Sequence, residues 1–194
     1  MALDILRPGL LDAAAELEQR RAPLFCLVLL TAGCALASFA LACATPFAAY
    51  AVIAAAMLPL PSALLVVAAA WIVNQAIGFG ALHYPHDPNT VFWGLAIGAA
   101  ALAATAAATL LLRALSRTSR LAALCAALLA AYCAYELVLL AFGPLLGGSG
   151  AFTLAIIVRL GLLNAAWLIG LVFVCQAAIM LDRTWRAAWP PESP

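Results

Sequence analysis

The sequence has few charged residues for its length. Only 9% of its 194 residues are charged and 68% are apolar, whereas ordinary soluble domains are about 25% charged and about 45–50% apolar. A soluble domain of this size needs far more polar surface than this composition supplies. The shortage excludes a cytosolic enzyme domain and a disordered tail, and it also excludes a nucleic-acid-binding protein, which would need basic patches. An integral membrane protein is the class that remains.

Lysine is absent, and the common motifs of catalysis and metal binding are absent as well. The six cysteines lie in apolar stretches and none forms a C-x-x-C pair, so neither a zinc site nor a disulfide framework is expected. There is no P-loop, no H-E-x-x-H pattern and no nucleophile motif. We therefore expect no enzyme activity, no catalytic residue, no cofactor and no dedicated metal site. Without a nucleotide site, the chain cannot energise transport with ATP by itself.

Residues 2–21 are not expected to be a signal peptide. They include seven charged side chains, without the order of basic region and apolar core that a signal peptide has. Pro8 can begin a helix at its first turn, and leucines and alanines give residues 8–21 an apolar side. We expect a short amphipathic helix on the membrane surface, within a cytoplasmic N-terminal segment of residues 1–22.

Long apolar runs fill most of the remaining chain. A membrane-spanning helix needs roughly 20 apolar residues. The apolar region 46–80 is too long for one helix, and Pro59 and Pro61 break it, because proline cannot continue a helix interior. The sequence therefore predicts an all-α bundle in a transmembrane domain over residues 23–181, followed by a tail of residues 182–194. The six predicted spans are 23–44, 46–59, 62–80, 91–112, 121–142 and 151–181.

The positions of the arginines predict the orientation. Arginines occur before the first span, between the fourth and fifth spans and after the sixth, whereas the loops 81–90 and 143–150 have none. Because cytoplasmic loops carry an excess of Arg and Lys, both termini and the 113–120 loop are expected on the cytoplasmic side of the cell (inner) membrane. An even number of spans agrees with this. If 46–80 were one span, the N-terminus and the 113–120 loop would lie on opposite sides.

Two of the predicted spans carry small residues at helical spacing. Gly33 and Ala37 are four residues apart in the first span. The fifth span has a ladder of alanines at Ala122, Ala126, Ala130 and Ala134. Helices pack in membranes through such residues, because lipid provides no hydrophobic drive for their association. Each face is expected to be either an internal seam or a docking surface for another membrane protein.

Two ionisable residues lie at membrane depth, where charges are costly and usually face the interior of a bundle. Glu136 and Arg159 flank the loop Gly143 to Gly150 at nearly equal distances. An antiparallel helix pair would place both roughly 10 Å below the outer end, at a rise of about 1.5 Å per residue. They are expected either to form an ion pair that joins two helices or to face a ligand, since an arginine can hold a carboxylate or phosphate.

Polar and aromatic residues gather on the outer side of the predicted membrane domain. The third span ends with Trp71, Asn74 and Gln75, and Trp93 begins the fourth span. The loop between these spans contains further hydrogen-bonding groups at His83, Tyr84, His86 and Asp87. We interpret this outer set either as an interfacial aromatic belt with a turn or as a lid over an outward-facing ligand pocket. On the sixth span, Asn164 adds a polar group near mid-membrane, one turn from Trp167.

In topology the chain resembles the substrate-binding S-component of energy-coupling-factor vitamin transporters. The similarity lies in six spans with cytoplasmic termini, a short second span broken by proline, small-residue helix faces and polar groups on the outer side. The resemblance implies a pocket in the outer halves of the helices. It also implies a membrane coupling subunit and ATPases as partners. In that family a small-residue face of the first span docks on the coupling subunit, and Gly33 and Ala37 are the nearest equivalent.

The sequence leaves more than one function open. The first is a binding subunit in the lipid bilayer for uptake of a small solute, such as a vitamin or a metal-containing cofactor, energised by separate subunits. The second is a structural or assembly subunit of a larger respiratory or photosynthetic complex. A small membrane enzyme is least favoured, because no catalytic set is present. Under the first hypothesis the ligand-binding residues are Trp71, Asn74, Gln75, His83, Tyr84, His86, Asp87, Trp93, Glu136, Arg159 and Asn164.

Overall fold

The computed structural model describes residues 23–41, 44–148 and 152–188, and every regular element in these ranges is a helix. The predicted all-α fold is therefore confirmed. The amphipathic helix expected at 8–21 and residues 189–194 of the expected tail lie outside the described residues. In chain order the elements are the helix Pro23–Leu41, α2 (Phe47–Met57), α3 (Leu60–Ala76), the π-helix η1 (Ile77–Ala81), α4 (Pro88–Ala114), α5 (Arg120–Phe142), the 3₁₀-helix η2 (Gly143–Leu146) and α6 (Leu154–Ala188).

Five of these helical segments are long and apolar enough to cross a membrane. They are Pro23–Leu41, Leu60–Ala81, Pro88–Ala114, Arg120–Leu146 and Leu154–Leu181. α2 differs from them, because its 11 residues rise only about 16 Å, whereas the hydrocarbon core of a bilayer is about 30 Å thick. Of the six predicted spans, the second is thus a helix too short to cross the membrane by itself.

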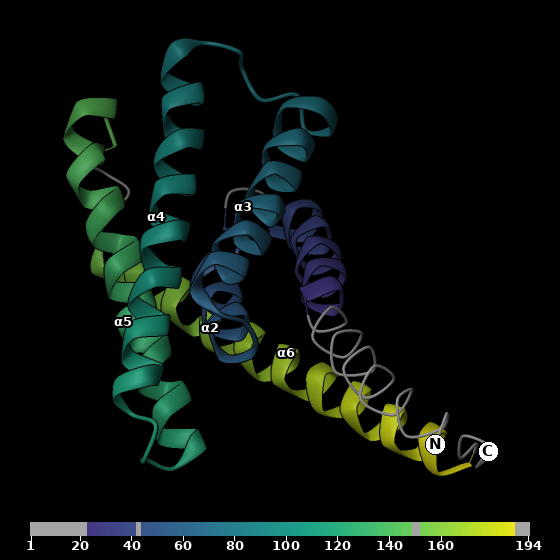
Figure 1. The fold of residues 1–194 in the computed structure, drawn as a ribbon. Helices are drawn as coiled ribbons and strands as arrows, with labels where there is room; N and C mark the ends of the chain where they lie inside the picture. Colours follow the sequence, from purple (N-terminus) through teal and green to yellow (C-terminus); the bar gives the residue numbers. More distant parts are fainter. Residues whose placement is uncertain (1–22, 42–43, 149–151, 189–194) are drawn as a thin grey trace, which may run out of the picture.

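α2 lies at the centre of the bundle (Figure 1). Its residues from Phe47 to Ala54 are all buried, and it packs against α3, α4, α5 and α6. A helix that is apolar on every side has to be covered on every side. The ring of Phe47 stacks on Tyr135 of α5 with 6.4 Å between centroids, and it meets Tyr50 edge-on at 5.9 Å. α2 therefore supplies the core around which the longer helices are arranged.

The chain reverses between α2 and α3 at the predicted prolines. Leu58 follows the last residue of α2 in an extended conformation, and Pro59 precedes the first residue of α3. Pro61 lies in the first turn of α3, where an N–H group would have no helical partner. The backbone N–H of Leu58 donates to the carbonyl of Ala54 at 2.9 Å and closes the end of α2. The predicted division of region 46–80 into two helices is confirmed.

α5 faces the bundle through alanines, but not through the predicted ladder. The buried alanines of α5 are Ala123, Ala127 and Ala131, spaced one turn apart. The predicted ladder is offset from them by one residue: Ala122 is exposed, and Ala126, Ala130 and Ala134 are half-buried. Alanines occur in adjacent pairs along this helix, so its sequence contains two ladders side by side. Spacing alone does not tell which of them faces the other helices.

The small residues of the helix Pro23–Leu41 divide between two environments. Ala37 is fully buried, and Gly33 is half-buried. Ala37 therefore belongs to an internal seam and is not available to a docking partner. Gly33 alone of this pair retains an accessible side.

α6 is the longest helix, with 35 residues, and it crosses the bundle obliquely (Figure 1). It contacts α2 and α5. It continues to Ala188, so it extends beyond residue 181, where the last span was predicted to end. Large apolar side chains such as Phe173 and Met180 are exposed on it, as expected for a helix that faces lipid.

Candidate functional site

Trp71 joins α3 to α4. Its indole N–H donates to the carbonyl of Gly94 at 2.8 Å. Its ring lies against Gly98, where an added Cβ would be only 2.7 Å from Cε2 of the indole. Trp71 also lines a cavity of about 240 Å³ between these helices, together with Val67 and Leu102. The polar atom of this predicted site residue is therefore bonded to a neighbouring helix.

Asn74 and Gln75 belong to a polar network between three segments of the chain. Nδ2 of Asn74 donates to Oγ of Ser38 and to Oγ1 of Thr45, both at 2.9 Å. Nε2 of Gln75 donates to Oδ1 of Asn74 at 3.1 Å. A side chain at Gly94 would overlap the amide of Gln75. The two amides connect α3 to the helix Pro23–Leu41 and to the segment before α2.

The loop between η1 and α4 is held by local contacts of its polar and aromatic residues. His83 is exposed and has a positive φ of 54°. The Tyr84 ring covers Gly78, where an added Cβ would be 2.8 Å from Cδ2. His86 lies beside the ring of Phe79, with 5.3 Å between centroids. Within the described residues there is no group of three or more His, Cys, Asp or Glu side chains that could hold a metal ion.

Asp87 and Trp93 fix the start of α4 and its neighbour η2. Asp87 caps α4: its carboxylate accepts from the backbone N–H of Thr90 at 3.0 Å and from the Thr90 hydroxyl at 2.8 Å. These hydrogen bonds, the one from the hydroxyl first, hold the pKa of the Asp87 carboxyl below its ordinary value. Trp93 donates its indole N–H to the carbonyl of Leu146 in η2 at 3.3 Å.

Asn164 joins α6 to the beginning of α2. Its Oδ1 accepts the backbone N–H of Ala49 at 3.1 Å, and its Nδ2 donates to the carbonyl of Leu160 at 2.9 Å. Ala49 lies in the first turn of α2, where backbone N–H groups have no intrahelical acceptor. The buried Asn164 side chain therefore satisfies a helix end inside the apolar core.

Glu136 and Arg159 do not form the expected ion pair. Oε1 of Glu136 is buried without a hydrogen-bond partner, and Arg159 is exposed. The hydroxyl of Tyr132 on α5 donates to the carbonyl of Ile157 at 2.6 Å, and its ring packs on Gly161. Ile157 and Gly161 thus mark the side of α6 that faces α5. Arg159 is two residues from each, about 200° around the helix, so it lies on the opposite side although its depth matches.

The predicted site residues therefore fall into separate groups. Trp71, Asn74, Gln75 and Trp93 are near one another at one end of α3 and α4, and the described hydrogen bonds of their polar groups go to protein atoms. Asn164 lies elsewhere, at the start of α2. That these residues bind a solute stays a prediction.

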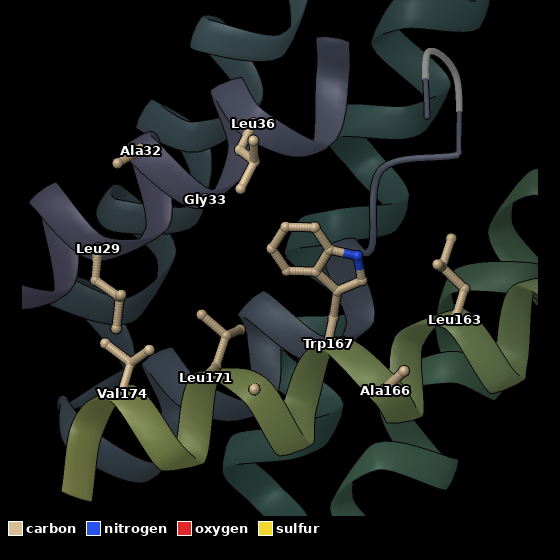
Figure 2. Close-up of a pocket in the computed structure, with 10 residues that line it drawn as sticks. Leu29, Ala32, Gly33, Leu36, Leu163, Ala166, Trp167, Leu171 and Val174 are labelled. Carbon is tan, nitrogen blue, oxygen red and sulfur yellow. The ribbon is translucent and has the colours of Figure 1, made fainter. Parts of the chain in front are cut away.

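A groove that the predicted site did not include lies between the helix Pro23–Leu41 and α6 (Figure 2). Its volume is about 510 Å³ and its walls are almost entirely apolar. Trp167 extends from α6 toward the first helix. We call this the α6 groove, defined by Leu29, Ala32, Gly33, Leu36, Leu163, Ala166, Trp167, Gly170, Leu171 and Val174.

Two polar groups at the α6 groove have no partner among the described residues. The indole N–H of Trp167, a lining residue, donates to no described acceptor. The hydroxyl of Tyr50 is buried and also has no hydrogen-bond partner. Tyr50 meets the Trp167 ring edge-on, with 6.2 Å between centroids, and its hydroxyl lies 3.7 Å from where a Cβ of Gly33 would be. In the sequence, the one-turn spacing of Asn164 and Trp167 pointed to this part of α6, but it did not predict the groove.

The fold defines the class of this protein as a multi-pass membrane protein: in the described ranges, five helices long enough to cross a bilayer surround one short buried helix. Comparisons with protein-family models, with curated proteins and with solved structures find no match to the chain.

Proposed function

We propose that the protein is a membrane-embedded binding subunit and that the α6 groove holds its ligand. One observation carries this proposal: the indole N–H of Trp167 lies in an apolar groove without a described acceptor. Leaving a donor unbonded away from water costs about 1–3 kcal/mol. A ligand that supplies the acceptor recovers this free energy. The hydroxyl of Tyr50, which is buried behind the groove and does not line it, is a second group close by without a described partner.

The shape and chemistry of the groove favour a small, mostly apolar molecule with a hydrogen-bond acceptor. Ligand sites are commonly about 300–1,000 Å³ in volume, apolar, and fitted with a few polar groups; the α6 groove has a volume of about 510 Å³. Trp167 and Gly33 lie near the middle of their helices, at 154–181 and 23–41. A ligand would thus enter from the lipid phase rather than from water.

The proposed role of this binding subunit is the uptake of a small solute. A membrane coupling subunit and ATPases would be separate partners that supply the energy. The arginine distribution favours a cytoplasmic 113–120 loop and C-terminus, and the two spanning helices between them, α5 and α6, agree with this. The N-terminus, which its two arginines also favour on the cytoplasmic side, lies there only if α2 and its flanking residues complete a sixth crossing. Single cysteines at Asn89 and Ser116, in a background without the native cysteines, test this orientation. An impermeant reagent added outside should label the residue at 89 only. Labelling of 116 and not 89 would invert the orientation and the proposed direction of uptake.

Filling the groove tests the binding proposal. A Cβ added at Gly170 meets no atom within 4 Å, so the first carbon of the side chain in Gly170→Leu fits without a clash and the rest of the leucine extends into space that lines the groove. Gly80→Leu is the matched control, since a Cβ at Gly80 also meets nothing within 4 Å and Gly80 does not line the groove. Small molecules extracted from each purified protein are compared by mass spectrometry. A compound present in the parent and in Gly80→Leu should be lost from Gly170→Leu.

The mass-spectrometry comparison would contradict the proposal if the parent and Gly170→Leu release the same small molecules in equal amounts. A second variant, Trp167→Phe, keeps an aromatic ring at this position but removes the indole N–H together with the five-membered ring of the indole. It should retain the fold and weaken binding about tenfold or more, the equivalent of losing a hydrogen bond to a ligand. If both variants bind like the parent, the ligand site is not in the α6 groove.

A structural or assembly subunit of a larger membrane complex is the second candidate. The observation that favours it is the use of the outer polar residues in bonds between helices, for example Trp71 to Gly94 and Asn74 to Ser38. Such bonds stabilise a scaffold. Co-purification of stoichiometric membrane proteins that persists in Gly170→Leu, together with the absence of any groove ligand in the parent, would support this candidate.

A further inference from the structure

A third cavity lies at the end of the bundle where α4 ends and α5 begins. Its volume is about 720 Å³. We call it the arginine cavity, and its polar lining comes from the end of α4, the α4–α5 loop, the start of α5 and one residue of α6. These residues are Thr109, Arg113, Ser116, Thr118, Arg120 and Gln176. It is separate from the α6 groove and shares no lining residue with it.

The two arginines determine the charge of the arginine cavity. Arg113 and Arg120 are the charged residues among its lining, and no acidic side chain lines it. Within the part of the chain that the structure describes, neither guanidinium has a hydrogen bond or an ion pair. The carboxyl ends of α2 and α4 and the amino ends of α3 and α5 meet at this cavity, which is lined by residues at all four ends. Their helix dipoles oppose one another, so the arginines leave the cavity positive.

Part of the wall below the arginines is apolar. Leu58, Ala123 and Leu124 are buried or half-buried members of the lining. Arg113 lies in the last turn of α4 and Arg120 is the first residue of α5. Both helices are long enough to span a membrane, so these two ends lie at the level of the lipid headgroups. The cavity thus combines a cationic mouth at headgroup depth with walls that are partly apolar and partly polar.

We infer that the arginine cavity binds a phosphate anion through Arg113 and Arg120. A guanidinium presents a planar fork of donors that matches two phosphate oxygens, and basic pockets between membrane helices at the membrane surface bind anionic headgroups. A phospholipid headgroup and a free phosphate share this chemistry. The apolar part of the wall makes the phospholipid the expected source, since its glycerol and acyl portions would contact it.

Thermal unfolding of the full chain in detergent measures this binding. The protein is titrated separately with phosphatidylglycerol, with phosphatidylcholine and with inorganic phosphate. Phosphatidylglycerol should raise the unfolding temperature saturably. Arg113→Gln and Arg120→Gln should each weaken the apparent affinity about fivefold to tenfold, because each removes one cationic contact. Arg120→Lys, which keeps the charge and loses the fork, should fall between Arg120→Gln and the parent.

Arg117→Gln is the matched control. It makes the same change in net charge in the same loop, but Arg117 does not line the cavity, so its affinity should equal that of the parent. A saturable shift with inorganic phosphate that equals the shift with phosphatidylglycerol identifies free phosphate as the source and still supports the site. The inference is overturned if neither anion gives a saturable shift, or if Arg117→Gln weakens binding as much as Arg120→Gln does.

Discussion

The two ends of the bundle use their polar residues in different ways. At the end formed by η1, the loop before α4 and η2, the sequence is rich in polar and aromatic groups, and Trp71, Asn74, Asp87 and Trp93 all bond to protein atoms. At the opposite end, Arg113 and Arg120 line a cavity without a described partner. The polar residues of the first end therefore mainly hold the protein together, whereas the arginines of the second end remain accessible to a ligand in the cavity that they line.

The membrane explains this contrast. An amide or indole at membrane depth has no water to bond, so it needs a protein partner. Arginines at the headgroup level are solvated by water and lipid phosphates, and they can do without a protein partner. Arg159 fits the same rule. It lies five residues after the start of α6, about 8 Å along the helix, within reach of the surface for a long side chain.

Gly98→Ala should give the largest effect at the polar end. The new Cβ would lie 2.7 Å from Cε2 of Trp71 and 2.9 Å from Nε1. The rigid indole would have to move and release its bond to Gly94, and overpacking of this kind costs about 1–3 kcal/mol. Thermal unfolding in detergent should show a clear decrease in the midpoint.

Gly80→Ala is the control for this prediction. A Cβ at Gly80 meets nothing within 4 Å, so the same substitution should leave the midpoint unchanged or raise it slightly. If Gly98→Ala unfolds at the temperature of Gly80→Ala, the contact of Trp71 with α4 is not a stabilising one, and the contrast between the ends loses its main support.

The positions of the helices could be predicted from the sequence, because hydropathy and proline act locally. The apolar runs and the pair Pro59 and Pro61 led to the correct division between α2 and α3. The role of α2 was harder to predict. The sequence predicts a membrane span at residues 46–59, whereas α2 is a helix of 11 residues, most of which are buried in the core. Burial on all sides, and not transmembrane passage, accounts for its apolar sequence.

Which side of each helix faces its neighbours could not be predicted with the same success. The alanine ladder on α5 was placed one residue away from the buried one at Ala123, Ala127 and Ala131. Glu136 and Arg159 were matched by depth, but the contact of Tyr132 with Ile157 turns Arg159 away from α5. Depth follows from counting residues, whereas the rotation of a helix depends on its tertiary neighbours. The α6 groove was missed for the same reason, because it arises between helices distant in the sequence.

Asn74→Ala should have an intermediate effect at the polar end. The substitution removes the amide group that donates to the buried hydroxyl of Ser38 and to the hydroxyl of Thr45. The expected loss in the free energy of unfolding is about 1–2 kcal/mol, since hydrogen bonds between membrane helices average less than 1 kcal/mol each. Asn89→Ala, at an exposed position, serves as the control. If Asn74→Ala unfolds at the same temperature as the parent, the Asn74 amide does not stabilise the fold. The amide would then be available to a ligand, and the interpretation of the outer polar residues as a binding pocket would be favoured again.

The smallest effect concerns Asp87 and depends on pH. Hydrogen bonds from Thr90 lower the pKa of Asp87 in the folded chain, so the cap on α4 stabilises the protein above the ordinary carboxyl pKa of about 3.9. That stabilisation is lost as the pH falls through the lower, folded value. NMR titration of the Asp87 carboxyl should therefore have a midpoint below the ordinary value. Thr90→Val removes the hydroxyl donor, keeps the backbone N–H, and should raise the midpoint toward that value. Equal midpoints in Thr90→Val and the parent would mean that the Thr90 hydroxyl does not bond to Asp87, and that at least one polar group of the crowded end is free after all.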